Sequence, residues 1–494
     1  MNISKEEYLS KINEVIENGR FKDDWASLSR HQTPRWYADA KFGIFIHWGI
    51  YSVPAYHNEW YSREMYDKTK QSYRHHIKTY GNQKDFGYKD FIPMFKGEKF
   101  NAAEWVDVFK KSGARYVMPV SEHHDGFVMY NTSFNRWNSV QMGPKRDVVG
   151  EIKAACDDAG LAFCASNHRA EHFFFMNMGK TIESDVNDEK YADFYGPAYY
   201  CDELGSMKMG AATADIYSVS PDKEFLDDWL VRVCEFIDDY KPHVLYFDWW
   251  IHNKAFKPYL KKIAAYYYNR AEEWGAEVTI NYKKQAFAPG TATLDVERGA
   301  LVGISPETWQ TCTAIGKRSW GYTADNQFKS AEQIICDLVD IVSKNGNMLL
   351  NVGPRSDGTL TERETAVLLE IGKWLSANGE GIYGTVPWLK FGEGKVNAKE
   401  GFFRDNKKKP FTKKDFRFTY KNGCVYAFQM KPSKSGVVKI KSFKKIKEDL
   451  IINKVSLLGS GEELDFSRDE KEMKIYLKNK SNGNLPICFK LEIG

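Results

Sequence analysis

The chain has 494 residues, and its 70 lysines and arginines nearly balance its 66 aspartates and glutamates, which gives a formal net charge of +4. A chain with so little net charge lacks the clear basic excess of proteins that bind nucleic acid or another polyanion. Hydrophobic residues make up 43% of it, and no apolar run approaches the roughly 20 residues that cross a membrane. We therefore expect a globular protein of more than one domain, with neither a nucleic-acid nor a membrane partner.

Residues 1–385 alternate between short apolar or β-branched runs and longer stretches with helical spacing. The predicted strands are 42–47, 115–120, 161–166, 243–248, 277–281 and 347–352. The predicted helices are 101–112, 147–158, 224–240, 257–273, 330–344 and 361–377. Such alternation is typical of a parallel sheet, and this many units favour a closed barrel over an open sheet. We predict an α/β fold for this domain, a (β/α)8-like TIM barrel.

Residues 386–494 differ from the rest in charge and composition. From residue 401 onward the chain has 22 basic and 11 acidic residues, a net of +11, which leaves a net of −7 for the first 400. Short strand candidates separated by Asn-Gly and Ser-Gly turns cover 416–420, 424–428, 436–440, 454–458 and 473–477. We predict a C-terminal antiparallel β-sandwich. Its basic surface either faces solvent or docks on the acidic barrel or on another subunit of a homo-oligomer.

The cysteines and the N-terminus bear on the compartment. The eight cysteines are widely spaced with no CxxC pair, which fits free thiols better than a zinc framework or a disulfide scaffold. The first residues include Glu6 and Glu7 and lack the apolar core of a secretory signal. We expect a cytoplasmic protein, with a secreted protein that has lost its signal as the alternative.

Polar and aromatic side chains follow five successive predicted strands. They include His47-Trp48, His123-His124, Asn167-His168, Asp248-Trp249 and Lys283. Each alone has a structural explanation, because a histidine after an apolar run is often part of the core and an aspartate there often caps a helix. In a barrel, however, the carboxyl ends of the strands meet at one mouth, where the chemistry of this fold takes place. A ring of tryptophan, histidine and carboxylate there fits a sugar, whose ring packs on aromatic faces and whose hydroxyls need hydrogen bonds.

Glycosidic cleavage needs one carboxylate as nucleophile or base and one protonated carboxyl as acid. Asp248 fits the nucleophile, because it directly follows a predicted strand and stands among aromatic residues. For the acid, Glu297, Glu59 and Glu171 are all candidates.

A series of motifs in fixed order carries a family resemblance. They are 36–54 with 59–61, 123–127, 137–139, 143–147, 247–248, 295–299, 319–322, 349–354 with 357–358, and 382–385. Over roughly residues 25–390 the chain thereby resembles glycoside hydrolase family 29, the alpha-L-fucosidases.

The resemblance implies a retaining exo-hydrolase, with a TIM barrel catalytic domain and no metal or cofactor, that releases terminal alpha-L-fucose from fucosylated oligosaccharides or glycosides. Asp248 matches the family's nucleophile, and Glu297 lies where its acid/base is expected. Lys283 falls where relatives often have arginine, and Phe45 and Trp320 fall where the family builds an apolar patch for the C6 methyl group. The positions that match residues bonding the sugar hydroxyls or lining the subsite are His47, Glu59, Trp60, His123 and His124.

Residues 166–172 depart from the commoner pattern of the family, which keeps Glu171 as a rival acid/base. The following segment to about residue 200 is interpreted as an insertion over the mouth. Three alternative functions stay open: an alpha-L-galactosidase, a non-catalytic fucose-binding relative, and a metal hydrolase. The metal hydrolase would use His123, His124, Asp125 and Asp248, although adjacent histidines on a strand point in different directions.

Overall fold

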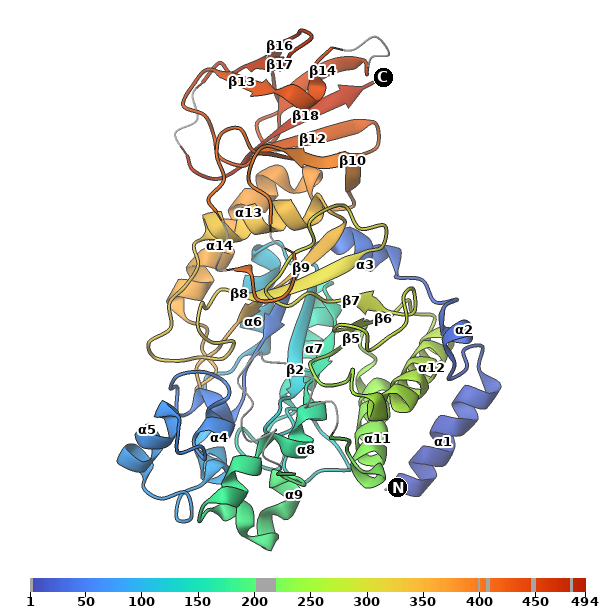
Figure 1. Ribbon diagram of the computed structural model, residues 1–494, viewed down its shortest axis with the longest axis vertical. Helices are drawn as coiled ribbons and strands as arrows, with labels where there is room; N and C mark the ends of the chain where they lie inside the picture. Colours follow the sequence, from blue (N-terminus) through green and yellow to red (C-terminus); the bar gives the residue numbers. More distant parts are fainter. Residues whose placement is uncertain (1–2, 201–218, 399, 406–408, 446–449, 480–482) are drawn as a thin grey trace.

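The structure, a computed structural model, describes residues 3–200, 219–398, 400–405, 409–445, 450–479 and 483–494. It consists of a barrel and a smaller β domain stacked along the long axis of the molecule (Figure 1). Among the described helices, none has the length and apolar character needed to cross a membrane.

Within the described residues the barrel has eight parallel strands, in the order β7-β6-β5-β4-β2-β1-β9-β8. Their bounds are β1 Phe42–Ile46, β2 Tyr116–Glu122, β4 Ala165–Asn167, β5 Val244–Phe247, β6 Thr279–Tyr282, β7 Thr293–Leu294, β8 Trp309–Ala314 and β9 Gly346–Val352. The short β3, Ala162–Phe163, precedes β4 and pairs with the start of β2. Between β7 and β8 a bridge from Asp295 to Gln310 nearly closes the ring.

The predicted α/β barrel is therefore confirmed, while two of its strands escaped prediction. β7 is only two residues long, and β8 reads Trp-Gln-Thr-Cys-Thr-Ala, which lacks an apolar run although all six residues are buried. Polar side chains are tolerated there because they bond to neighbouring strand-end groups, as Gln310 does with Asp295 (2.9 Å).

The six predicted helices of the barrel are present as α6 Ala102–Lys111, α7 Val148–Ala159, α11 Lys223–Tyr240, α12 Lys257–Trp274, α13 Ala331–Val342 and α14 Glu362–Asn378. Most begin at a side chain that accepts a backbone N–H, for example Asn101 at α6 and Ser330 at α13. The shorter or N-terminal helices are α1 Lys5–Asn18, α2 Trp25–Leu28, α3 Arg35–Ala40, α4 Tyr61–Glu64, α5 Gln71–Tyr80, α8 His172–Phe175 and α9 Ala192–Tyr195.

The C-terminal domain pairs a six-stranded sheet, β10-β11-β12-β18-β14-β15, with a three-stranded one, β13-β17-β16. The strands are β10 Val386–Glu393, β11 Phe416–Lys421, β12 Cys424–Gln429, β13 Val437–Ile440, β14 Ile452–Leu457, β15 Glu462–Glu463, β16 Asp465–Arg468, β17 Met473–Tyr476 and β18 Ile487–Ile493. All pairs within the two sheets are antiparallel, and the strands bury one core that includes Phe418, Ile440 and Ile475. The predicted antiparallel β-sandwich is confirmed.

The β-sandwich docks on the barrel through α13 and α14, which lie between the two domains in Figure 1. Most of α13 is buried, because one side packs against β9 and the other against β10 and β11. At its end Asp340 pairs with Lys344 and with Arg417 of β11, and both Asp340 and Arg417 are buried.

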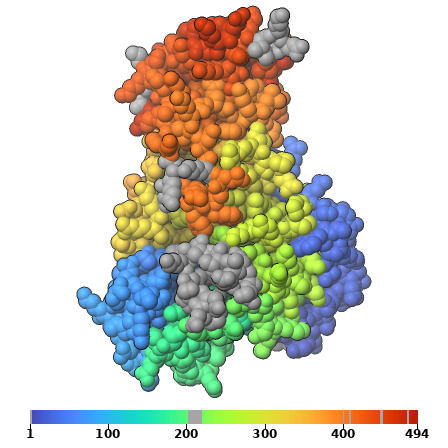
Figure 2. Space-filling view, in the orientation of Figure 1, coloured from blue at the N-terminus to red at the C-terminus, as the bar shows by residue number. Residues whose placement is uncertain are grey.

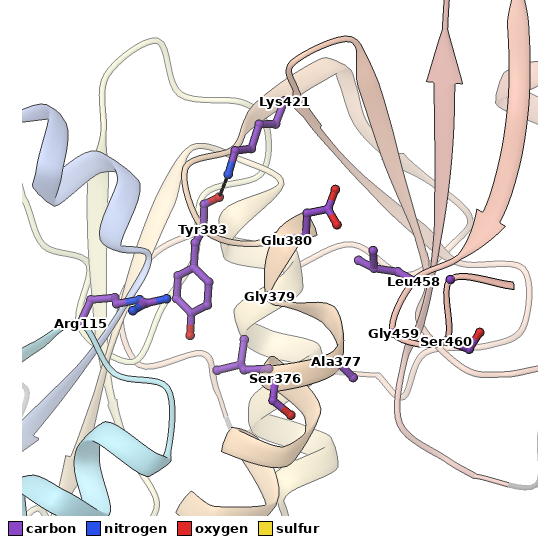
Figure 3. Close-up of a pocket in the computed structure, with 12 residues that line it drawn as sticks. Arg115, Ser376, Ala377, Gly379, Glu380, Tyr383, Lys421, Leu458, Gly459 and Ser460 are labelled. Atoms are coloured by element: carbon purple, nitrogen blue, oxygen red, sulfur yellow. Dashed lines mark hydrogen bonds between the residues drawn. The ribbon is translucent and has the colours of Figure 1, made fainter.

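An open cavity of about 690 Å³ lies at this junction (Figure 3). Arg115, Tyr383, Lys421 and the 458–461 turn line it. Arg115 directly precedes β2, so this cavity lies at the amino ends of the barrel strands, opposite the mouth where the predicted site residues stand.

Candidate active site

The ten predicted site residues gather at the carboxyl ends of the barrel strands. His47 follows β1, His123 and His124 follow β2, and Asp248 follows β5. Eight of the ten are at least nine-tenths buried, and Trp60 and Trp320 are partly buried. Every one of them takes part in the contacts given below, so the structure brings the whole predicted set together.

Asp248 stands at the centre of these contacts. Its Oδ2 lies 3.0 Å from His168 Nδ1 and 3.4 Å from His124 Nε2, and its Oδ1 lies 3.3 Å from Lys283 Nζ. Burial by itself would raise the pKa of Asp248, but the neighbouring His168, the charge of Lys283 and the hydrogen bonds from His124 and His168 hold it well below the usual value. Asp248 is therefore an anion across the neutral range.

Glu297 has the opposite electrostatic balance. Its Oε2 accepts a hydrogen bond from Trp249 Nε1 (2.5 Å) and contacts Lys283 Nζ. Burial raises the pKa of Glu297, and the nearby charge of Asp248 raises it further, while Lys283 only partly offsets both. The pKa of Asp248 is thus lowered and that of Glu297 is raised, a difference that suits Asp248 to act as the anion and Glu297 as the protonated acid.

Lys283 connects the two carboxyl groups. Its ammonium nitrogen contacts Glu297, and it also lies 3.4 Å from Oδ2 of the fully buried Asp295. Burial opposes its charge, but Cys312 and the surrounding carboxylates keep the pKa of Lys283 well above its usual value. Asp295 is held in turn by Gln310 and by Cys312, whose Sγ lies 3.1 Å away.

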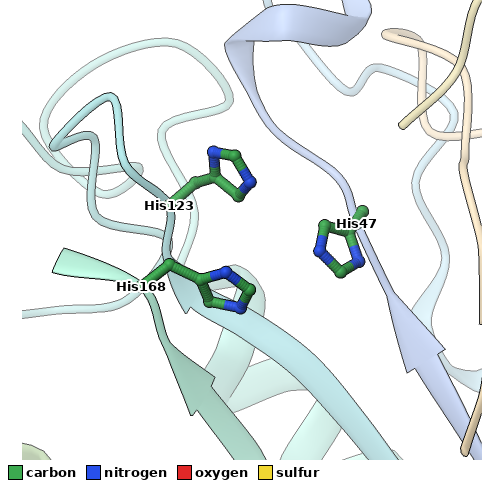
Figure 4. A group of neighbouring side chains, drawn as sticks. All are labelled: His47, His123 and His168. Atoms are coloured by element: carbon green, nitrogen blue, oxygen red, sulfur yellow. The ribbon is translucent and has the colours of Figure 1, made fainter. Parts of the chain in front are cut away.

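The imidazoles of His47, His123 and His168 lie close together (Figure 4), and His168 is the one that bonds to Asp248. His47 Nδ1 lies 2.6 Å from Asn351 Oδ1, and the ring of His123 stacks on that of His168 at 5.2 Å. Burial lowers the pKa of all three, so they are neutral. Both nitrogens of His168 are bonded within the protein, to Asp248 and to Ser166 Oγ (3.0 Å), whereas the buried Nδ1 of His123 has no hydrogen-bond partner among the described residues. By distance alone, described side chains form two groups that could hold a cation: His47 with His123 and His168, and His124 with His168 and Asp248. The adjacent His123 and His124 fall into different groups, as expected from their divergent directions.

An apolar wall faces this cluster. The ring of Phe45 lies 4.5 Å from that of His47 and 6.2 Å from that of Trp320. Glu59 fixes the loop that bears Trp320, since its Oε2 accepts from Ser319 Oγ and from the Trp320 amide, both at 2.9 Å. Glu59 is thus occupied as an acceptor, which fits a binding or structural role better than proton transfer.

The rival Glu171 also lies at the site, on the far side of His124 from Asp248. Its Oε2 is 3.8 Å from His124 Nδ1. Burial raises the pKa of Glu171 to about 7. The charges of Glu171 and Asp248 outweigh the burial of His124 and raise its pKa to about 9. Trp60 completes this side, with its ring 5.9 Å from that of His124 and 5.2 Å from that of Phe175.

Sequence reasoning assigned no role in the site to three contributors: His168, Trp249 and Asp295. His168 and Trp249 follow predicted strands, but the choice among neighbouring polar residues depends on which way each side chain turns. Asp295 follows β7, a strand that the sequence did not reveal. Phe175 belongs to the segment interpreted as an insertion and does reach the site. The part of the chain from 201 to 218 lies outside the described residues.

Comparison with known proteins agrees with this geometry. Residues 8–380 match the model of the family described as Alpha-L-fucosidase, and residues 408–493 match the Alpha-L-fucosidase C-terminal domain. Tissue alpha-L-fucosidase of Rattus norvegicus is 28% identical, over 94% of this chain and 90% of the relative. Alpha-L-fucosidase of Dictyostelium discoideum is 31% identical, over 77% of this chain and 78% of the relative.

Solved structures extend the likeness to three dimensions. The crystal structure of Thermotoga maritima alpha-fucosidase in complex with fucose is 30% identical, covers 96% of this chain and 100% of its own, and superposes with a TM-score of 0.73. With a family match over most of the chain and a barrel mouth that carries paired carboxyl groups, this protein belongs to the alpha-L-fucosidase family, glycoside hydrolase family 29, and is an alpha-L-fucosidase.

Proposed function

We propose that this alpha-L-fucosidase acts by a retaining mechanism in which Asp248 is the nucleophile and Glu297 the acid/base. The observation that carries the proposal is that both carboxyl groups contact the same Lys283 Nζ. Since a hydrogen bond spans about 3 Å, the two bonded oxygens lie within roughly 6 Å of each other. That spacing favours a covalent retaining route over an inverting one, which needs about 6.5–9.5 Å to admit a water between the carboxyls.

In the first step an oxygen of Asp248 attacks C1 of the fucose, and the bond from C1 to the leaving oxygen breaks as Glu297 transfers its proton to that oxygen. In the second step the Glu297 carboxylate takes a proton from water, whose oxygen attacks C1 and releases Asp248. Lys283 stabilises the carboxylate that Glu297 becomes between the steps, and His168 holds Asp248 by its Oδ2.

The substrate we propose is a terminal alpha-L-fucose on an oligosaccharide or glycoside. The neutral His47 and His123 supply hydrogen-bonding nitrogens for hydroxyls, and Phe45 and Trp320 supply an apolar surface for the C6 methyl. A sugar with a C6 hydroxyl there would lose a hydrogen bond to water, at a cost of about 1–3 kcal/mol.

The decisive experiment is Asp248→Gly. It removes the nucleophile, so hydrolysis of an aryl fucoside should be lost, and azide in the space left should restore turnover and yield fucosyl azide of inverted configuration relative to the substrate. Asp125→Asn serves as the matched control. Asp125 is likewise an aspartate after a barrel strand, β2, but it bonds to Tyr88 Oη (2.7 Å) and the Phe127 amide rather than to the site. Loss of activity without azide rescue would contradict the assignment of Asp248.

We also propose that the chain acts in the cytoplasm and that it forms a homo-oligomer. The seven described cysteines are all free, six of them buried, which supports a reducing compartment. Cell fractionation tests the first proposal and sedimentation velocity the second.

A further inference from the structure

A segment of the C-terminal half of the chain, residues 401–405, lies on the barrel beside Glu297. It belongs to the connection between β10 and β11, the first two strands of the β-sandwich. Figure 2 shows orange atoms of this region reaching down from the β-sandwich onto the yellow part of the barrel.

Backbone and charge contacts fix this segment to the loop that carries Glu297. The Phe403 amide donates to the Glu297 carbonyl (3.0 Å), and the Arg404 amide to the Arg298 carbonyl (2.6 Å). The side chain of Asp405, which is 5% exposed, bonds to Lys329 Nζ (2.7 Å) and Thr313 Oγ1 (2.9 Å). The segment is therefore an anchored part of the barrel mouth.

The two backbones approach so closely that side chains are excluded between them. A Cβ atom at Gly299 would lie 2.3 Å from the Gly401 carbonyl oxygen, and Gly401 itself has φ +108°. Arg298 (φ 45°) and Phe403 (φ 57°) both occupy the left-handed region that such residues seldom adopt. Strained backbone of this kind persists where the surrounding contacts hold it, and it gathers at functional sites.

This conformation places an exposed aromatic ring next to the proposed acid. The Phe403 ring stacks on Trp249, with centroids 5.8 Å apart and planes at 18°, and Trp249 Nε1 donates to Glu297 Oε2. Phe402 packs on the same indole at 5.2 Å. Phe403 keeps 37% of its surface exposed, whereas most of the large apolar residues in the described chain are buried.

We propose that Phe403, supported by Trp249, forms a platform for the ring to which the fucose is attached. The inference rests on Glu297 as the acid, because the group that protonates the leaving oxygen must lie beside the leaving group. A sugar or aryl ring on that oxygen then meets an aromatic face, against which its C–H or π face packs. The C-terminal domain thereby takes part in choosing the aglycone.

The test compares Phe403→Ala with the parent enzyme on three fucosyl substrates. Fucosyl fluoride has no ring in its leaving group, 4-nitrophenyl fucoside has a ring but needs little protonation, and a fucosyl disaccharide has a ring and needs protonation. We expect kcat/KM for both ring-bearing substrates to fall about tenfold relative to that for the fluoride, mainly through KM. Phe403→Tyr, which keeps the ring, should restore the parent ratio, and Tyr476→Ala, an exposed aromatic on β17, should leave it unchanged.

Three outcomes would overturn the proposal. If only the disaccharide suffers and through kcat, the segment positions Glu297 and binds no ring. If all three substrates suffer equally, Phe403 is merely structural, and if none changes, the ring plays no part. Failure of the assignment on which the proposal rests would instead appear in Glu297→Gln, if that variant, unlike Glu171→Gln, did not discriminate between leaving groups, and this comparison is independent of Phe403.

Discussion

At the scale of single residues, Asp248 and Glu297 show how the same functional group takes two roles. Both are buried beside Lys283, yet the pKa of Asp248 is lowered and that of Glu297 is raised. The difference lies in the surroundings of each group. Two imidazoles bond to Asp248, whereas Glu297 is buried near the negative charge of Asp248, which disfavours a second anion.

These directions predict a bell-shaped dependence of kcat/KM on pH. Activity needs Asp248 ionised and Glu297 protonated, so it should fall when the pH rises through the raised pKa of Glu297 and when it drops through the lowered pKa of Asp248. Glu297→Gln should remove the alkaline limb for an activated aryl fucoside. For a fucosyl disaccharide it should reduce kcat about 10²–10⁴-fold, the usual contribution of acid catalysis.

Glu171→Gln is the control for that variant. Because the pKa of Glu171 is raised to about 7, it is a second carboxyl group able to set an alkaline limb. If Glu171→Gln, rather than Glu297→Gln, discriminates between leaving groups, the acid/base assignment moves to Glu171.

At the scale of elements, a buried ion network ties α11 to the strands that carry the histidines. Glu122, the last residue of β2, is fully buried and bonds to Arg169 Nη1 (2.9 Å) and Arg232 Nη2 (2.8 Å). Arg232 belongs to α11, and Asp228 of the same helix bonds to Arg169 (2.8 Å). Since His123 and His168 directly adjoin Glu122 and Arg169, the network fixes two strand ends of the site.

Arg232→Met should therefore lower the free energy of unfolding by about 3–5 kcal/mol, because it leaves Glu122 a buried charge with one partner fewer. Urea unfolding followed by tryptophan fluorescence measures this. The control is Arg136→Met, whose pair with Asp193 is about half exposed and worth at most about 1 kcal/mol. Similar losses in the two variants would contradict the role given to the network.

At the scale of the whole molecule, the two domains share a core. Tyr426, Phe428 and Cys488 of the β-sandwich belong to the same apolar cluster as Trp374 and Leu375 of α14. Trp374 Nε1 also donates to the Pro486 carbonyl (2.8 Å). The domains are therefore expected to unfold together rather than one after the other.

Calorimetry should accordingly show a single unfolding transition. It should remain single in 1 M NaCl, because the Arg417–Asp340 pair between the domains is buried and salt screens mainly exposed charges. Arg417→Met should lower the unfolding free energy by about 3–5 kcal/mol. Lys490→Met, which breaks the exposed interdomain pair with Glu380, should change it by at most about 1 kcal/mol. Two separate transitions in the parent chain would contradict the shared core.

Much of this protein was predictable from local sequence. Apolar runs, helix caps and Asn-Gly turns act over a few residues, so six barrel strands, six helices and the β-sandwich could be read directly. The polar residues after those strands could be assigned to one mouth because a parallel barrel brings strand ends together. By itself the sequence thus determined the barrel, the sandwich and the candidate carboxylates, including Asp248 and Glu297.

Only the tertiary structure decided how those groups differ and what else joins them. Which carboxyl keeps its proton depends on burial and on Lys283, His124 and His168, whose arrangement no local pattern encodes. Phe403 lies more than a hundred residues after Glu297, in a domain whose sequence shows no sign of the site, and reaches it only because the β10–β11 connection folds back onto the barrel. Pairings of this kind arise from packing between distant segments, which is why they appear in the folded molecule and not in the order of its residues.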